Sequence, residues 1–289
     1  MSVFDRQYQV WEGERTTPFT RLLILPRYAF RDIFSSRLFT ALFTASFGPT
    51  IIASLLIWVR NNVSLLEKFG LKGAAIADLP TADGRVFLFM MFLQLWFAAI
   101  LTFIQGPALV SPDLVNGALP LYLSRPVTRT QYVLGKFLVL AILLSLITWI
   151  PLSYLFFLQA SLAGGSWLFE NLRLLFGIVF GSLLAVAVLS IAALAISAYA
   201  KAKALARALA AGLLIIPSGF GEVLNEALDT HWGRMLNVVA SLESVSATLL
   251  GVPHRVELPL AGGLASLVFV GIVSLLLLNR RLRAFEVVR

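Results

Sequence analysis

The chain alternates between long apolar runs and short polar segments. A helix needs about 20 mostly apolar residues to cross the roughly 30 Å hydrocarbon core of a bilayer. None of the runs alternates with the period of two that is typical of barrel strands. The pattern therefore predicts an all-α integral membrane protein with six transmembrane helices. These helices are expected over residues 38–59, 86–110, 133–158, 174–198, 205–223 and 258–278.

The fifth apolar run is interrupted by Pro217-Ser218-Gly219-Phe220-Gly221 after about a dozen residues. At about 1.5 Å per residue, that length is too short to cross a bilayer. Either the helix continues through a break to Val223, or the chain turns within the outer leaflet. Backbone that is broken at membrane depth must be buried in protein or line a wet cavity. We therefore expect residues 217–257 to form an outward cap rather than a free loop.

Residues 1–37 are predicted to form a cytoplasmic N-terminal arm that ends in an amphipathic helix. Proline is favoured in the first turn of a helix, so Pro26 is expected to open this helix, which runs to about Arg37. Apolar side chains follow helical spacing along it, while Arg27 and Arg31 share another face. A basic amphipathic helix before a span usually lies in the membrane interface. We therefore expect an interfacial anchor.

The balance of charged residues separates a membrane protein from a nucleic-acid-binding protein. Only 13% of the residues are charged and 59% are hydrophobic, whereas soluble domains carry about 25% charged residues. The formal net charge of +8 is therefore interpreted as cytoplasmic positive charge, and no nucleic-acid partner is expected.

Most of the 23 Lys and Arg residues fall on the side of the spans that holds both termini, which predicts that this side is the cytoplasm. We therefore predict a transmembrane domain over residues 38–279 and a basic cytoplasmic tail over residues 280–289. No cleavable signal is expected, since residues 1–17 lack an apolar core.

The polar stretch over residues 111–136 carries unusually clear helix signals. Ser111 is expected to cap a first short helix that Gly117 ends. Pro120 cannot extend that helix but can open a second one, as far as Ser124. The segment from Thr128 to Gln131 has the pattern of a capping box at the start of the third span. The stretch is therefore predicted to form a compact, angled helical elbow between the second and third spans.

The pattern D-L-x-N-G-A-L-P-L-Y-L-S-R-P-V-T-R-T-Q-Y-V-L-G-K in this elbow resembles the same connection in permease subunits of ABC exporters of the type-2 class. The matching positions are Asp113, Gly117-Ala118-Leu119, Pro126-Val127-Thr128-Arg129 and Gly135-Lys136. Pro120 departs from the family pattern, which more often has an acidic or polar residue there. The predicted number of spans also fits this family.

The resemblance implies a permease subunit that couples ATP hydrolysis in a separate ATPase to export of a substrate. It implies two ATPase copies, which bind ATP and Mg so that this chain needs no cofactor, and a second permease copy as a homodimer or related heterodimer. It also implies a multi-pass protein of the cell inner or plasma membrane, with re-entrant helices between spans five and six. The elbow is then a cytoplasmic coupling helix, and the alternative for the N-terminal amphipathic helix is that it also contacts the ATPase subunit. The residues expected to contact the ATPase are Asp113, Asn116, Gly117, Leu119, Leu121, Tyr122, Arg125, Pro126 and Arg129.

Other polar or small residues in the predicted spans have less specific meanings. Gly177 and Gly181 permit close helix packing, within the subunit or between two copies. Gln94 is expected to pair with a neighbouring helix. Glu222 and Glu226 share a helix face, which we interpret as a solvated polar face; a polar collar at the outer mouth of a transport path is the alternative. No metal site is expected, because the H-E-x-x-H pattern is missing.

Two of three alternatives to an ABC permease require different sequence features. A secondary carrier is disfavoured by the scarcity of ionisable residues inside the spans. An intramembrane enzyme lacks catalytic side chains, since the chain has no Cys, two His and no G-x-S-x-G motif. The chain also lacks a P-loop, so any ATP must bind elsewhere. A non-transporting scaffold coupled to an ATPase has the same sequence features as a permease.

Overall fold

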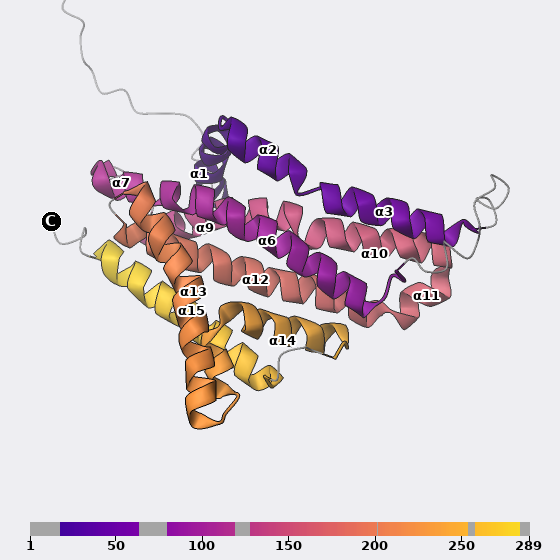
Figure 1. The fold of residues 1–289 in the computed structure, drawn as a ribbon. Helices are drawn as coiled ribbons and strands as arrows, with labels where there is room; N and C mark the ends of the chain where they lie inside the picture. Colours follow the sequence, from indigo (N-terminus) through magenta and orange to yellow (C-terminus); the bar gives the residue numbers. More distant parts are fainter. Residues whose placement is uncertain (1–17, 64–79, 119–127, 201, 254–257, 284–289) are drawn as a thin grey trace, which may run out of the picture.

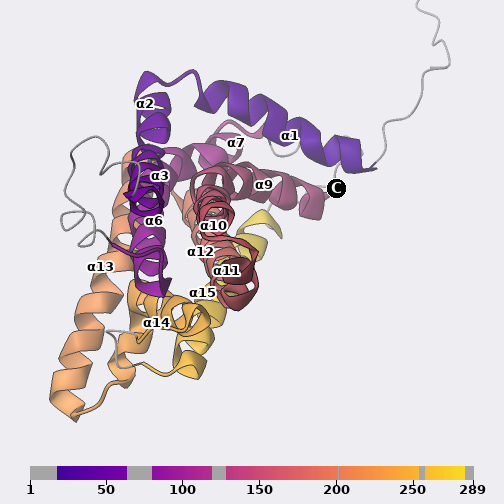
Figure 2. The same ribbon diagram turned by 90° about the vertical axis from the view of Figure 1, so that its right-hand side faces the viewer.

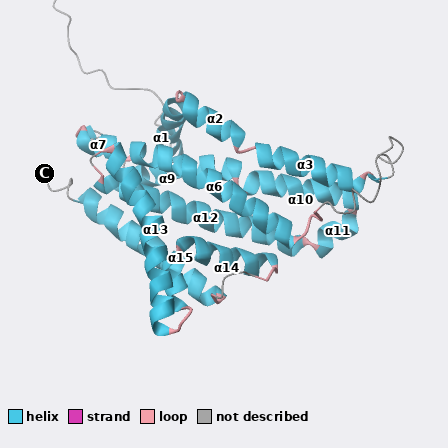
Figure 3. Cartoon of the chain, in the orientation of Figure 1, coloured by secondary structure: helices cyan, strands magenta, loops and turns pink. Residues whose placement is uncertain are grey.

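The computed structural model describes residues 18–63, 80–118, 128–200, 202–253 and 258–283. Within these residues every regular element is a helix (Figures 1 and 3). Five helical stretches of the described chain are long and apolar enough to cross a membrane, and they coincide with five of the six predicted spans. They are Arg37–Asn61, Gly84–Val115, Arg129–Ala163, Leu172–Tyr199 and Leu260–Leu282. The predicted all-α membrane fold is confirmed.

The N-terminal helix differs from its prediction at both ends. Helix α1 extends over Pro18–Ile33 and has Pro26 inside it, so Pro26 does not open the helix. A proline removes one backbone hydrogen bond but does not by itself stop a helix that is packed elsewhere, and α1 packs against α9 (Arg129–Ile147). Arg37 belongs instead to α2 (Arg37–Ala45), which Ser36 caps by accepting from the Phe39 amide at 3.4 Å.

Two of the membrane-length stretches are broken near their middles. The first consists of α2 and α3 (Gly48–Asn61), separated by a turn at Ser46 and Phe47. The second consists of α9 and α10 (Trp149–Ala163), which meet at Thr148 with φ −110° and ψ −98°. Helices α3 and α10 pack against each other. The two breaks therefore lie in adjoining stretches rather than at unrelated places.

Helix α12 (Leu172–Tyr199) is the centre of the bundle. It packs against α6 (Gly84–Leu109), α9, α15 (Leu260–Arg283) and α14 (Val238–Leu250). The short α11 (Gly165–Glu170) leads into it. Buried residues form two apolar clusters, one around α1 and α9 and the other around α10 and α14, and α12 contributes to both. This one helix therefore connects the two ends of the molecule.

The predicted break at Pro217 is wrong. Helix α13 runs continuously over Lys203–Leu228 with Pro217 inside it, so the first part of the expected cap is the end of this helix. The prediction failed because it treated proline and glycine as a stop, although a proline is tolerated where neighbouring contacts support the helix. Helix α13 contains the predicted fifth span but is not among the five membrane-length stretches of the described residues. It crosses the bundle obliquely and projects beyond α15 (Figures 1 and 2).

The rest of the predicted cap forms short helices. The 3₁₀ helix η1 (Trp232–Leu236) follows α13 and leads into α14, the shorter apolar helix, which packs against α12, α15 and α6. Helix α14 ends at Gly251, which has the left-handed φ of 71° that favours glycine. The expectation that this region is not a free loop is confirmed for residues 217–253, while 254–257 lie outside the described residues.

Candidate functional site

The elbow after the second span begins with α7, a single helical turn over Ser111–Val115. As predicted, Gly117 ends it, and its φ of 63° is a backbone conformation that glycine adopts without strain. Asn116 and Gly117 are both exposed. Five expected contact residues lie outside the described residues: Leu119, Leu121, Tyr122, Arg125 and Pro126. The predicted second short helix, as far as Ser124, lies outside them too.

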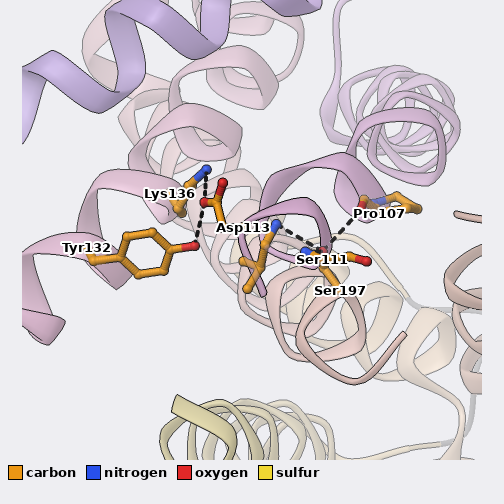
Figure 4. A network of polar contacts seen from close by, with 7 residues as sticks. Pro107, Ser111, Asp113, Tyr132, Lys136 and Ser197 are labelled. Carbon is orange, nitrogen blue, oxygen red and sulfur yellow. Dashed lines mark hydrogen bonds and ion pairs between the residues drawn. The ribbon is translucent and has the colours of Figure 1, made fainter. Parts of the chain in front are cut away.

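The start of α7 is fixed by Ser197 of α12 rather than by Ser111 (Figure 4). The Ser197 Oγ accepts from the backbone amides of Val110 and Ser111, each at 3.1 Å, and donates to the Pro107 carbonyl at 3.3 Å. Ser111 does not cap the helix as expected, because its Oγ donates to the Ala200 carbonyl at 2.6 Å. A serine from a neighbouring helix thus serves the amides that are left free where α7 begins and a carbonyl near the end of α6.

Asp113 connects α7 to α9. Its Oδ2 accepts from the Tyr132 hydroxyl at 2.7 Å and lies 2.8 Å from the Lys136 Nζ (Figure 4). The side chains of Lys136 and Asp113 are only 13% and 15% exposed, and Tyr132 is fully buried. Hydrogen bonds to charged groups are stronger than neutral ones. The Asp113 side chain is therefore engaged within the chain, and its expected contact with an ATPase stays a prediction.

The capping box at the start of α9 is confirmed. The Thr128 Oγ1 accepts from the Gln131 amide at 3.2 Å, and the Gln131 side chain accepts from the Thr128 amide at 2.9 Å. Arg129 is the first residue of this helix and is half-buried. The capping box fixes where the chain re-enters the bundle after the elbow.

The contacts around α7 form a joint that we define by Ser111, Asp113, Tyr132, Lys136 and Ser197. It unites the ends of α6, α9 and α12. Sequence reasoning did not assign Tyr132, Lys136 or Ser197 to this site. The Gly-Lys pair of the motif was a signal for Lys136. Ser197 lies in an apolar run and had no such signal.

The glycine motif in the fourth span is used within the subunit. A Cβ on Gly177 would lie 2.8 Å from the Leu250 Cδ2 and 3.0 Å from the Leu250 amide nitrogen of α14. A Cβ on Gly181 would lie 3.2 Å from the Ser246 Oγ. These glycines therefore let α14 approach α12 closely. Of the two alternatives left open by the sequence, packing inside one subunit is the one that the structure supports.

Glu222 and Glu226 both lie exposed on α13. The Glu222 Oε1 is 3.9 Å from the Arg234 Nε of η1, at a carboxylate that is 60% exposed. Such exposed pairs contribute little to stability. In the described part of the chain, no group of three or more His, Cys, Asp or Glu side chains is arranged to hold a metal ion. A role of Glu222 and Glu226 at the outer mouth of a transport path stays a prediction.

Gln94 meets the break between α9 and α10, as expected of a buried amide in a bundle. In the amide orientation that satisfies every partner, its oxygen accepts from the Thr50 Oγ1 at 2.7 Å. Its nitrogen donates to the carbonyls of Ile147 and Thr148 at 3.1 and 2.9 Å. A broken helix leaves carbonyls without intrahelical partners. Gln94 of α6 serves the Ile147 carbonyl in this way, adds a second donor to the Thr148 carbonyl, which also accepts from the Leu152 amide at 3.3 Å, and links both to α3.

The fold defines an all-α, multi-pass membrane protein. Comparison with models of protein families adds a more specific identification, because the model described as ABC-2 family transporter protein matches residues 31–252. This range is well over half of the chain, which therefore belongs to the ABC-2 family of transporter proteins. The family consists of membrane permeases of ABC transporters, whose partner is an ATPase. A search of curated proteins finds no match.

Proposed function

We propose that the chain is the membrane-spanning subunit of an ATP-driven exporter, in which a separate ATPase hydrolyses ATP and the elbow transmits its movement. The family membership supports the permease part of this proposal. The single observation that carries the coupling part is the joint around α7. It ties one short, partly exposed helical turn to α6, α9 and α12 through buried or half-buried polar contacts.

The mechanism is mechanical. Two permease copies, identical or related, associate with two ATPase copies in the inner or plasma membrane, with the termini and the elbow in the cytoplasm. Binding of ATP closes the ATPase pair and displaces the elbow. Because Asp113 joins α7 to α9 and Ser197 joins α7 to α12, a displacement of α7 moves both helices together. The two permease bundles then shift relative to each other and open an outward path.

The expected contact residues have different roles in this proposal: Asp113 acts within the chain, and the others contact the ATPase. Asp113 faces Tyr132 and Lys136 within the chain, so its role in coupling is to hold the elbow at a fixed angle. Asn116 and Gly117 are exposed at the tip of α7 and are available to an ATPase surface. Arg125 and Arg129 supply the positive charge for charge-assisted contacts with acidic groups of that partner.

The test is purification of the tagged chain from its native membrane in mild detergent, with identification of the proteins that accompany it. We expect a stoichiometric P-loop ATPase. The double variant Arg125→Ala/Arg129→Ala should lose the ATPase, while Arg85→Ala, at the opposite end of α6, should retain it. A stable preparation of the unchanged chain without any ATPase would overturn the proposal and make a secondary carrier the leading alternative.

A further inference from the structure

A large crevice lies between α12, α13, η1 and α15. Its volume is about 1170 Å³, more than the roughly 300–1,000 Å³ of common small-molecule pockets. The described residues that line it include no charged side chain, and most of them are aliphatic or aromatic. A crevice of this kind inside a membrane bundle is surrounded by hydrocarbon, so it fits an apolar ligand.

The length of the crevice matches one leaflet of a bilayer. Along α15 its lining extends from Ala265 to Leu277, twelve residues further on, which is about 18 Å of helix. Half of the roughly 30 Å hydrocarbon core is about 15 Å. An extended acyl chain of a single leaflet therefore fits along this wall.

One end of the crevice has the chemistry of a headgroup region. Tyr199 lines this end, and its hydroxyl donates to the Leu277 carbonyl at 3.0 Å. The Arg281 guanidinium lies 5.9 Å from the centre of the Tyr199 ring, and its Nε donates to the Ala198 carbonyl at 3.3 Å. Arg280 is exposed beside it. Aromatic and basic residues at the end of a span are typical of the membrane interface and attract anionic lipids.

The other end is closed by η1, which packs against both α13 and α15. The Gly233 amide donates to the Asn225 Oδ1 at 2.8 Å, and a Cβ on Gly221 or on Gly233 would collide with the carbonyl of the other glycine. This contact fixes η1 to α13. A single acyl chain can enter a crevice that is closed at this end from the basic end, and a second copy of the chain is the alternative occupant that the last test addresses.

We propose that this crevice binds one phospholipid, with an acyl chain along α12, α13 and α15 and an anionic headgroup at Arg280 and Arg281. The bound lipid fills the space between α13 and the bundle and so holds α13 in place. The binding is independent of ATP and of the ATPase proposed above, so the two proposals are tested separately.

The first test compares two glycine variants with the unchanged chain. Gly212 lines the crevice from α13, and a Cβ there meets only the Ile216 Cδ1, at 3.5 Å. Gly212→Leu should therefore fold and place its side chain in the crevice. Gly271→Leu is the matched control, because Gly271 is a helical glycine with nothing within 4 Å and does not line the crevice.

Native mass spectrometry of the full chain, purified in mild detergent, should find phospholipid on the unchanged chain and on Gly271→Leu, with anionic lipid enriched over the membrane average. Gly212→Leu should lose most of it. Ala265→Leu, which narrows the same crevice from α15, should give the same loss. Equal retention in all four proteins would overturn the proposal.

The second test locates the lipid and identifies its headgroup. The full chain is reconstituted in vesicles of phosphatidylcholine and phosphatidylglycerol that contain phosphatidylglycerol with a photoactivatable acyl chain. Labelling should concentrate on Phe269 and Val273 of the crevice, and it should fall several-fold in Arg280→Gln/Arg281→Gln but not in Arg85→Gln. Labelling that is even over all lipid-facing helices would contradict the proposal.

The alternative that a second copy of the chain occupies the crevice is tested in the same vesicles. The chain contains no Cys, so Phe269→Cys introduces a single thiol at the crevice. Lipid occupation predicts that oxidation leaves this variant uncrosslinked. A disulfide-linked dimer would show that a partner subunit occupies the crevice and would overturn the lipid assignment.

Discussion

At the scale of single residues, the molecule depends on a few polar side chains that satisfy backbone or charged groups inside an apolar bundle. Asp113 accepts from Tyr132 and pairs with Lys136, while Gln94 serves two carbonyls at the break between α9 and α10. Polar groups that are buried without partners cost free energy, so each of these contacts is needed once the helices are packed. The sequence identified Asp113 and Gln94 as candidates for partners but could not say which residues they meet.

Tyr132→Phe should lower the free energy of unfolding by about 1 kcal/mol, because it removes a buried hydrogen bond to a carboxylate and leaves Asp113 with Lys136. The shift in thermal unfolding midpoint in detergent measures the effect. Tyr154→Phe is the matched control, since Tyr154 is 54% exposed, and should leave the midpoint unchanged. Equal midpoints for the two variants would mean that the Tyr132 hydroxyl contributes nothing to the joint.

Gln94→Leu should destabilise the fold by about 1–3 kcal/mol, since it leaves the Ile147 carbonyl without a donor in a buried place and leaves the Thr148 carbonyl with the Leu152 amide alone. Gln159→Leu is the control, because it removes an exposed hydrogen bond from the Asn61 amide and should change the stability little. Both are measured as shifts in thermal unfolding. A Gln94→Leu protein as stable as the unchanged chain would show that the broken helix satisfies these carbonyls in another way.

At the scale of elements, five of the predicted spans could be read from the sequence because a membrane crossing needs a long apolar run, and length alone identifies it. The capping box of α9 was also predictable, since both partners lie within four residues of each other. Pro26 and Pro217 were misinterpreted because whether a proline ends a helix depends on what packs around it. The contact of Ser197 with α7 joins residues far apart in the chain, and no local pattern reveals it.

Gly177→Ala should destabilise the protein by about 1–3 kcal/mol, because its Cβ would press on Leu250 and force α14 away from α12. Gly271→Ala, in a helix with open space around it, should be neutral or stabilise by up to about 1 kcal/mol. The midpoint of thermal unfolding should therefore fall in Gly177→Ala and stay the same or rise in Gly271→Ala. The oligomeric state should be the same in both, since Gly177 faces α14 of its own chain. A change of oligomeric state in Gly177→Ala would instead place this glycine at a subunit interface.

At the scale of the whole molecule, α12 is the element that connects the elbow with the opposite end of the bundle. It has 28 residues, which is about 42 Å of helix. Near one end, Ser197 is hydrogen-bonded to the start of α7, and toward the other end α14 packs closely on Gly177 and Gly181. A displacement of the elbow therefore reaches the far side of the bundle along one continuous helix, provided that the Ser197 contact holds.

Ser197→Ala should weaken this transmission, because the amides of Val110 and Ser111 lose their acceptor on α12. The reporter is a spin label at Gly165→Cys, an exposed residue of α11 at the far end, whose distance to the same label in the second permease copy is measured with and without ATP. We expect the distance change on ATP binding to be reduced in Ser197→Ala. Ser190→Ala is the matched control, because the Ser190 Oγ is buried in the same helix and makes no hydrogen bond within the described chain. It should respond like the unchanged protein. An unreduced response in Ser197→Ala would mean that the elbow acts through α9 alone, by way of Asp113 and Lys136, and that α12 follows passively.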